Sequence, residues 1–342
     1  MAIELSSLTF TGQDDVVPVS GVEQILNTGI ANTLAGNDMI TGTITGSDRF
    51  GILNSGIINT GAGHDIITGI CDENTIIPGN GIRNEGGSIN TDDGNDTIIG
   101  IGQAGDGILT TVGTINTSDG NDTITGTAIH SGINVNSQGI LDTGNGNDTI
   151  TGTGGYGIQN YYIFNTGDGN DKITGNATFL GGYGIINNGT MDAGAGHDEI
   201  TGTSPNGWGI YNYFGSTMDT GDGNDKITGT GSTGIYNNGI ITTGNGKDSI
   251  IADGGFNGTG SVLLGNGKDY LRGFGSGIFN GGDDRDILEL TSGSYTVEIS
   301  GTTVNFTKDS TTMKTSEFEK LIAGYTTYDF TSLTTGQIIT VA

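Results

Sequence analysis

Apolar residues recur along this chain at a fixed distance from an aspartate. Eleven repeat aspartates are each followed two residues later by isoleucine or leucine. These apolar residues are Ile40, Ile67, Ile98, Ile124, Ile150, Ile173, Ile200, Ile227, Ile250, Leu271 and Leu288. The aspartates lie 17 to 31 residues apart, and a repeat of this length is typical of a solenoid whose units bury apolar faces against one another. The pattern therefore predicts a stacked, repetitive fold.

Each repeat contains three short β-segments, as residues 209–234 show. The first is Gly-Ile-x-Asn, the second precedes an acidic turn, and the third is Asp-x-Ile-Thr-Gly. The apolar residues expected to point inward from the first segment are Ile52, Ile82, Ile158, Ile185, Ile210, Ile235 and Ile278. Those expected from the second are Ile89, Ile115, Ile140, Ile163, Met191, Met218 and Ile240. Asparagines that end the first segment should form an amide ladder, and they are Asn54, Asn84, Asn160, Asn187, Asn212, Asn237 and Asn280.

Three strands and glycine-rich corners in each repeat favour an all-β fold. We expect a right-handed parallel β-helix, or β-solenoid, of about ten coils with terminal caps. Helices should be nearly absent. Residues 315–322 are the best helix candidate, with a short strand or a turn as the alternative.

Composition narrows the classes of partner. The 67 glycines of the 342 residues have no Gly-X-Y period, which excludes collagen. A formal charge of −27 disfavours nucleic acid and anionic membranes and favours cations. The single cysteine, Cys71, excludes a disulfide framework, and no apolar run is long enough to span a membrane.

The acidic turn has the chemistry of a calcium site. Its glycines allow positive φ and can turn main-chain carbonyls inward, while the aspartates add carboxylates; hard oxygen donors of this kind favour Ca²⁺. The repeat aspartates expected to bind calcium are Asp38, Asp65, Asp96, Asp122, Asp148, Asp171, Asp198, Asp225, Asp248, Asp269 and Asp286. Further acids occupy the variable position of several turns, at Asp93, Asp119, Asp168, Asp222 and Asp283. A solvated corner is the alternative, but stacked carboxylates without a cation would repel one another.

These turns resemble the hemolysin-type calcium-binding repeats of RTX proteins, whose unit is Gly-Gly-x-Gly-x-Asp-x-U-x with U apolar. Residues 281–289 come close to that unit, with Asp284 in place of a glycine, and the resemblance covers about residues 30–290. It implies a calcium-binding solenoid. The turn occurs here once per coil instead of twice, which implies one row of ions. Lys247 and Lys268 place a positive charge beside the last turns.

The repeats divide the chain into three expected regions. Residues 1–30 form an N-terminal cap, 31–290 the calcium-binding solenoid, and 291–342 a C-terminal cap with a β-hairpin around Gly301. The start lacks the features of a Sec signal peptide, and the last residues resemble a C-terminal type I secretion signal. We therefore expect an extracellular or cell-surface protein.

No catalytic constellation is evident in the sequence, because its three histidines and its basic residues are few and scattered. We expect a non-enzymatic, calcium-stabilised solenoid with a structural or cell-surface role as matrix, envelope layer, filament or adhesin, which associates with itself or with a surface or matrix polysaccharide. The alternatives are a carbohydrate-binding or ice-binding module, or a polysaccharide-active β-helix enzyme. Threonines after the third-segment apolar residues suggest ice, although Lys172, Glu199 and Lys226 interrupt that face. Aromatic residues that could bind a surface or a sugar are Tyr156, Tyr183, Trp208, Tyr211 and Tyr236.

Overall fold

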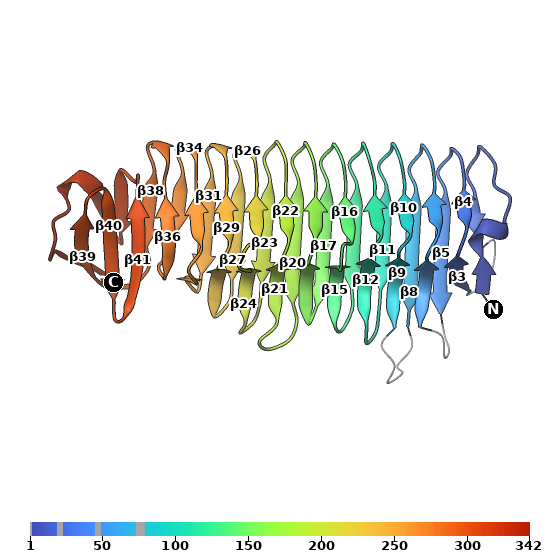
Figure 1. Ribbon diagram of the computed structural model, residues 1–342, viewed down its shortest axis with the longest axis horizontal. Coiled ribbons are helices and arrows are strands. Elements are labelled where there is room, and N and C mark those ends of the chain that lie inside the picture. The colour runs from blue at the N-terminus through green and yellow to red at the C-terminus, as the bar shows by residue number, and fades with distance from the viewer. Residues whose placement is uncertain (1, 19–22, 45–48, 73–78) are drawn as a thin grey trace.

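The protein is a straight rod of stacked coils, as a computed structural model of the chain shows (Figure 1). The structure describes residues 2–18, 23–44, 49–72 and 79–342. The two termini lie at opposite ends of the rod, because every coil adds one layer along its long axis (Figure 1). In the solenoid each coil contributes one strand to each of three parallel sheets.

Sheet A contains the first strand of each coil. Its strands, in spatial order, are β1 (Ala2–Glu4), β3 (Gln24–Asn27), β6 (Phe50–Asn54), β9 (Asn80–Glu85), β12 (Asp106–Thr111), β15 (Ser131–Asn136), β18 (Tyr156–Asn160), β21 (Tyr183–Asn187), β24 (Trp208–Asn212), β28 (Thr233–Asn237) and β32 (Phe256–Asn257).

Sheet C contains the short strand before the acidic turn. Its strands are β4 (Ile30–Asn32), β7 (Ile57–Asn59), β10 (Ser88–Asn90), β13 (Thr114–Asn116), β16 (Ile140–Asp142), β19 (Ile163–Asn165), β22 (Thr190–Asp192), β25 (Thr217–Asp219), β29 (Ile240–Thr242), β33 (Ser261–Leu263), β36 (Gly277–Asn280), β41 (Thr311–Ser316), β40 (Thr303–Lys308), β39 (Gly293–Ser300) and β44 (Ile338–Val341).

Sheet B contains the strand after the acidic turn. Its strands are β2 (Val16–Val17), β5 (Met39–Ile44), β8 (Ile66–Cys71), β11 (Thr97–Ile101), β14 (Thr123–Thr127), β17 (Thr149–Gly154), β20 (Lys172–Ala177), β23 (Glu199–Thr203), β27 (Lys226–Thr230), β31 (Ser249–Asp253), β35 (Tyr270–Arg272), β38 (Ile287–Leu290), β42 (Lys320–Ala323) and β43 (Thr326–Asp329). Four two-residue strands of the turns form a small sheet D, namely β26 (Asp222–Gly223), β30 (Asn245–Gly246), β34 (Asn266–Gly267) and β37 (Asp283–Asp284).

The predicted all-β parallel solenoid is confirmed. Eleven strands pair in sheet A across the described residues, which agrees with about ten coils. The described helices are two 3₁₀ turns, η1 (Leu5–Ser7) and η2 (Phe330–Ser332). The right-handed sense of the coil stays a prediction, and no described helix is long and apolar enough to cross a membrane.

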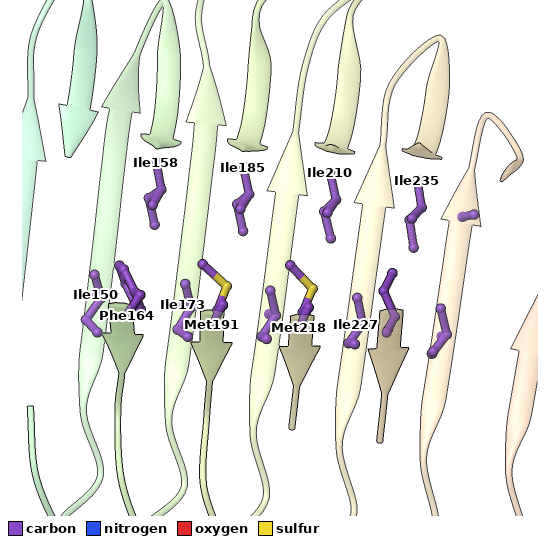
Figure 2. Packing of buried hydrophobic residues seen from close by; sticks show 14 of the residues in the cluster. Ile150, Ile158, Phe164, Ile173, Ile185, Met191, Ile210, Met218, Ile227 and Ile235 are labelled. Atoms are coloured by element: carbon purple, nitrogen blue, oxygen red, sulfur yellow. The ribbon is translucent and has the colours of Figure 1, made fainter. Parts of the chain in front are cut away.

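The core of the rod consists of three inward columns, one from each sheet. Figure 2 shows Ile158, Ile185 and Ile210 in one column, with those of the other two sheets beneath it. The third-strand column predicted from the sequence is buried along its whole length. Because each side chain stacks on its equivalent in the next coil, apolar contact continues along the axis without a globular centre.

The second-strand column differs from the expectation at three coils. Ile140, Ile163 and Ile240 point outward, and the residue that follows each of them is buried instead. The pairs in register are Ile115 with Leu141, Leu141 with Phe164, Phe164 with Met191, Met191 with Met218 and Met218 with Ile241. In these coils two adjacent residues are apolar, and the alternation of a strand allows only one of them to face the core.

The expectation for Ile278 and Asn280 was also wrong. Their segment, β36, pairs with β33 in sheet C, so Phe279 is buried and Ile278 is 46% exposed. The interval between the last two repeat aspartates is only 17 residues. A coil this short has no full sheet A strand, and its only pairing there among the described residues is a single bridge between Phe256 and Gly275.

The asparagine ladder is confirmed where its members lie in sheet A. The Asn160 amide nitrogen donates to the Asn187 oxygen at 2.8 Å, and Asn187 donates to Asn212 at 2.9 Å. The same nitrogen of Asn160 also donates to the carbonyl of Thr190 in sheet C. The ladder therefore ties sheet A to sheet C at their shared corner.

Replacing Ile173 with aspartate should destabilise the protein by several kcal/mol, because Ile173 is 1% exposed and a carboxylate there would have no partner. The matched change is Lys172→Thr at the exposed neighbouring position. It should cost at most about 1 kcal/mol, since it removes only the ion pair of Lys172 with Glu199. Urea unfolding measures both; equal effects would contradict the inward and outward assignment.

The C-terminal segment changes from parallel to antiparallel pairing. β39 and β40 form a hairpin with Gly301 at φ 62°, and β41 continues it. Residues 315–322 form no helix; they lie at the end of β41 and the start of β42. At the other end of the rod, η1 places Leu5 in the core, and β1 pairs with β3. The region boundaries at residues 30 and 290 stay predictions.

Candidate calcium site

The repeat aspartates, Asp38 to Asp286, lie in one buried line that we call the aspartate row. Each is 0–2% exposed, directly before its sheet B strand. From Asp38 to Asp269, the backbone amide of each aspartate donates to Oδ1 of the aspartate in the following coil, at 2.7–2.9 Å. One carboxylate oxygen of each side chain therefore joins consecutive coils.

The second carboxylate oxygen, Oδ2, is buried and has no hydrogen-bond partner from Asp65 to Asp286. A threonine lies five residues before most of the aspartates. In the first coil the Thr33 hydroxyl donates to Oδ2 of Asp38, whereas from Asp65 onward no threonine does so. Thr117 and Thr143 donate to the carbonyl oxygens of the threonines in the next coil, at 3.2 and 3.3 Å. Because a hydroxyl has one proton to donate, Oδ2 is left without a donor.

Main-chain carbonyls of the turn glycines face the next coil. A methyl group added at Gly146 would lie 1.4 Å from the carbonyl oxygen of Gly120, and one at Gly167 would lie 1.9 Å from that of Gly144. Gly144 and Gly146 have φ of 81° and 141°, a region that glycine adopts without strain. Because these two glycines have no side chain, the main-chain carbonyl oxygens of the preceding coil are not covered at either position.

These groups fit a hard cation. Among the described residues, no three acidic, histidine or cysteine side chains converge, so side chains alone do not complete a metal shell. A carboxylate oxygen without a donor, together with glycine carbonyls, supplies the oxygen-only ligands that Ca²⁺ prefers. Bound calcium would supply positive charge to the aspartate row and cross-link neighbouring turns.

The acids at the variable position of the turns lie apart from the aspartate row. Asp93, Asp119, Asp168, Asp222 and Asp283 are all exposed at the outer edge of the turn. Asp119 accepts a hydrogen bond from the Asn145 amide at 2.7 Å, which pairs adjacent coils on the surface. Lys247 and Lys268 are exposed on the same outer edge, whereas the aspartates beside them point inward. The lysine charge is therefore on the opposite side of the turn from Oδ2.

Burial controls the protonation of the aspartate row. Desolvation raises the pKa of Asp96, Asp148, Asp198 and Asp269 to about 7, against the hydrogen bond that each accepts from a backbone amide. Desolvation likewise raises the pKa of Asp171, Asp248 and Asp286 to about 6. Neighbouring carboxylates add repulsion at several of these positions. Near neutral pH the buried carboxylates of the aspartate row are therefore stabilised either by protonation or by binding a cation.

Glu319 continues the aspartate row and was missed by the sequence analysis. Its Oε2 accepts the backbone amide of Asp286 at 2.7 Å, as the next aspartate would. The signal was present, because Leu321 follows Glu319 by the same two residues and pairs with Leu288. The C-terminal cap thus satisfies the last turn of the row.

The predicted aromatic residues lie together on sheet A. The rings of Tyr156 and Tyr183 stack with centroids 5.6 Å apart, and Trp208 lies 4.9 Å from Tyr183 and 4.6 Å from Tyr236. Tyr211 packs edge-on against Trp208. Contacts between these rings stabilise the stack of coils, and a role in binding a surface or a sugar stays a prediction.

No protein-family model matches the chain, and no curated protein sequence does. Among solved structures it is similar to the X-ray crystal structure of a hyperactive, Ca²⁺-dependent, β-helical antifreeze protein from an Antarctic bacterium. The sequences are 19% identical over 82% of this chain and 78% of that one, with a TM-score of 0.46. The fold of this chain is assigned from its own strand pairing, and the resemblance to hemolysin-type repeats stays a prediction.

Proposed function

We propose that this chain is a secreted, calcium-stabilised rod with a structural role outside the cell or on its surface. The observation that supports this best is the aspartate row, whose buried Oδ2 atoms have no donor from Asp65 to Asp286. Calcium between the turns would turn this unfavourable row into the element that holds the coils together. The proposal assigns the chain no catalytic role. Negative-stain electron microscopy with and without calcium tests it directly, because ordered rods should appear only with the ion.

Sheet C offers a surface through which such rods could pack side by side. From β4 to β36 its first outward column contains no charged residue, and Lys314 of β41 is the next residue in register. The column is Ile30, Ile57, Ser88, Thr114, Ile140, Ile163, Thr190, Thr217, Ile240, Ser261 and Ile278. Ile30 is 68% and Ile57 40% exposed. An uncharged, mostly β-branched column on a negatively charged rod favours contact with a second copy once calcium lowers the repulsion.

Calcium should therefore drive self-association, and Ile57→Lys should weaken it. Light scattering during a calcium titration measures the effect, and Ile57→Lys should raise the protein concentration needed for assembly severalfold. Ile129→Lys is the matched control, because Ile129 is 50% exposed but lies outside sheet C. A protein that folds with calcium and stays monomeric at high concentration would contradict assembly.

Ice binding is a second candidate because the sheet C column is regular and uncharged. Sheet B is less suited, since Lys172 and Lys226 both form ion pairs with Glu199 on its outer face, at 2.9 and 3.0 Å. Thermal hysteresis of the calcium-loaded protein, lost in Ile57→Lys and kept in Ile129→Lys, would favour ice binding over lateral assembly.

A further inference from the structure

An open trough runs along the outer face of sheet A, away from the acidic turns. One part of it has a volume of about 470 Å³ over β15, β18 and β21, within the range of ligand sites. A second hollow lies over β6, β9 and β12. Both are lined by His130, so they form one continuous surface along the rod axis.

The floor of the trough contains amides whose hydrogen-bonding groups are not all used. Asn134 is 6% exposed; its Nδ2 donates to Oδ2 of Asp106 at 3.2 Å, while its Oδ1 has no partner. Gln159, in register with Asn134 in the next coil, is 5% exposed and forms no side-chain hydrogen bond with the described residues. The Asn134 oxygen lies beneath the surface, so the Gln159 amide is the group that a ligand hydroxyl can reach.

Tyrosines form the sides of the same trough. Tyr156 and Tyr183 line one part of it, and Tyr161 and Tyr213 also line it. All four rings are half-buried. Tyrosine beside amides suits a sugar, because the ring carbons pack against the C–H face of a pyranose while its phenol and the amides bind the hydroxyls.

The N-terminal end of the trough is basic, in a chain with a formal charge of −27. Arg49 and Arg83 are the only lysine or arginine residues before Lys172, and both line the hollow that His130 shares. Arg83 pairs with Glu85 at 3.0 Å, whereas Arg49 forms no ion pair with the described residues. Asp106 accepts a hydrogen bond from the His130 ring at 2.7 Å. This hydrogen bond raises the pKa of His130 and so favours the charged imidazolium. The basic residues that looked scattered in the sequence are therefore partly gathered here.

We propose that this trough binds a linear polysaccharide containing hexuronate residues. Pyranose rings would lie between the tyrosines over Asn134 and Gln159, and a carboxylate would lie at the Arg49 end. Spacing supports a chain that runs along the rod, because successive coils are about 4.8 Å apart, close to the length of one sugar in an extended polymer. Arginine suits the carboxylate, since its fork of donors matches the two oxygens.

Isothermal titration calorimetry with a galacturonate hexamer tests the proposal, with a glucose hexamer as the neutral comparison. The calcium-loaded protein should bind the acidic hexamer more tightly. Arg49→Gln should weaken that binding about tenfold, as expected for loss of a charged hydrogen bond. Tyr213→Ala should weaken both hexamers about fivefold through loss of ring contact.

Two control variants remove the same groups outside the trough. Lys314→Gln removes an exposed cation of the C-terminal cap, and Tyr325→Ala removes a fully exposed ring. Both should bind like the unaltered protein, and circular dichroism melting confirms that all variants are folded with calcium. Acidic-hexamer binding that is unchanged in both trough variants would place the sugar elsewhere and overturn the proposal. No binding, or binding of only the neutral hexamer, would also overturn it. These outcomes leave the calcium proposal intact, because folding is measured separately.

Discussion

Removing calcium should strongly destabilise this protein. In excess chelator at pH 8 the β-sheet signal in circular dichroism should be lost at a much lower temperature than in calcium, and returning calcium should restore the original melting temperature. The physical reason is the aspartate row, where carboxylates of adjacent coils are buried one strand spacing apart, about 4.8 Å, and repel one another when ionised. Most strands contribute only one buried isoleucine to the core. Burial of so few apolar side chains offsets little of the conformational entropy that a glycine-rich chain loses on folding.

Asp148→Asn separates the role of calcium from that of packing. Asparagine keeps the oxygen that accepts the Asp122 amide at 2.8 Å but loses the second carboxylate oxygen and the charge. The metal-free protein should therefore become more stable at pH 8, while the rise in melting temperature on adding calcium becomes smaller. Asp168→Asn is the matched control in the exposed part of a turn and should change neither quantity appreciably. An unchanged spectrum and melting temperature in chelator would show that the fold does not depend on the ion.

Acidification should stabilise the metal-free protein. Burial raises the pKa of Asp96, Asp148, Asp198 and Asp269 to about 7 in the folded state, above the unfolded value of 3.8. A raised folded pKa means that the folded state binds protons more tightly. The resulting stability is fully present below the unfolded pKa and is lost as pH rises through about 7. Between pH 5 and pH 8 the metal-free melting temperature should thus fall, by about 10 °C or more when several groups contribute.

Calcium should reverse this trend, because it binds the ionised carboxylates. The calcium-dependent rise in melting temperature should be larger at pH 8 than at pH 5, where protons compete for the same oxygens. Thermal melts in chelator and in calcium at the two pH values give all four numbers. A metal-free protein that is more stable at pH 8 than at pH 5 would contradict the protonated row.

Much of the fold could be predicted because the repeat is locally encoded. In Asp-x-Ile-Thr-Gly the aspartate directly precedes the strand and the isoleucine lies two residues later, so the alternation of extended backbone turns both side chains inward whatever the rest of the coil does. The second strand was less certain, since Ile140 and Leu141 are both apolar and only contact with the neighbouring coils selects Leu141.

The metal turn could be located from the sequence but not completed. The sequence identified the aspartates and the glycines that surround them. The sequence could not show that one carboxylate oxygen of Asp148 accepts the Asp122 amide while the other has no partner. These contacts depend on the spacing and register between adjacent coils.

The sequence by itself determined the stacked fold, the inward aspartate and isoleucine of each third strand, and the glycine turn, because these follow from spacing within a few residues. Only the tertiary structure decided the contacts between coils. Arg49, Asn134 and Tyr213 lie on one face although more than seventy residues separate each from the next. Coil lengths vary from 17 to 31 residues, so register between outward positions is set by hydrogen bonding between strands and not by a constant interval.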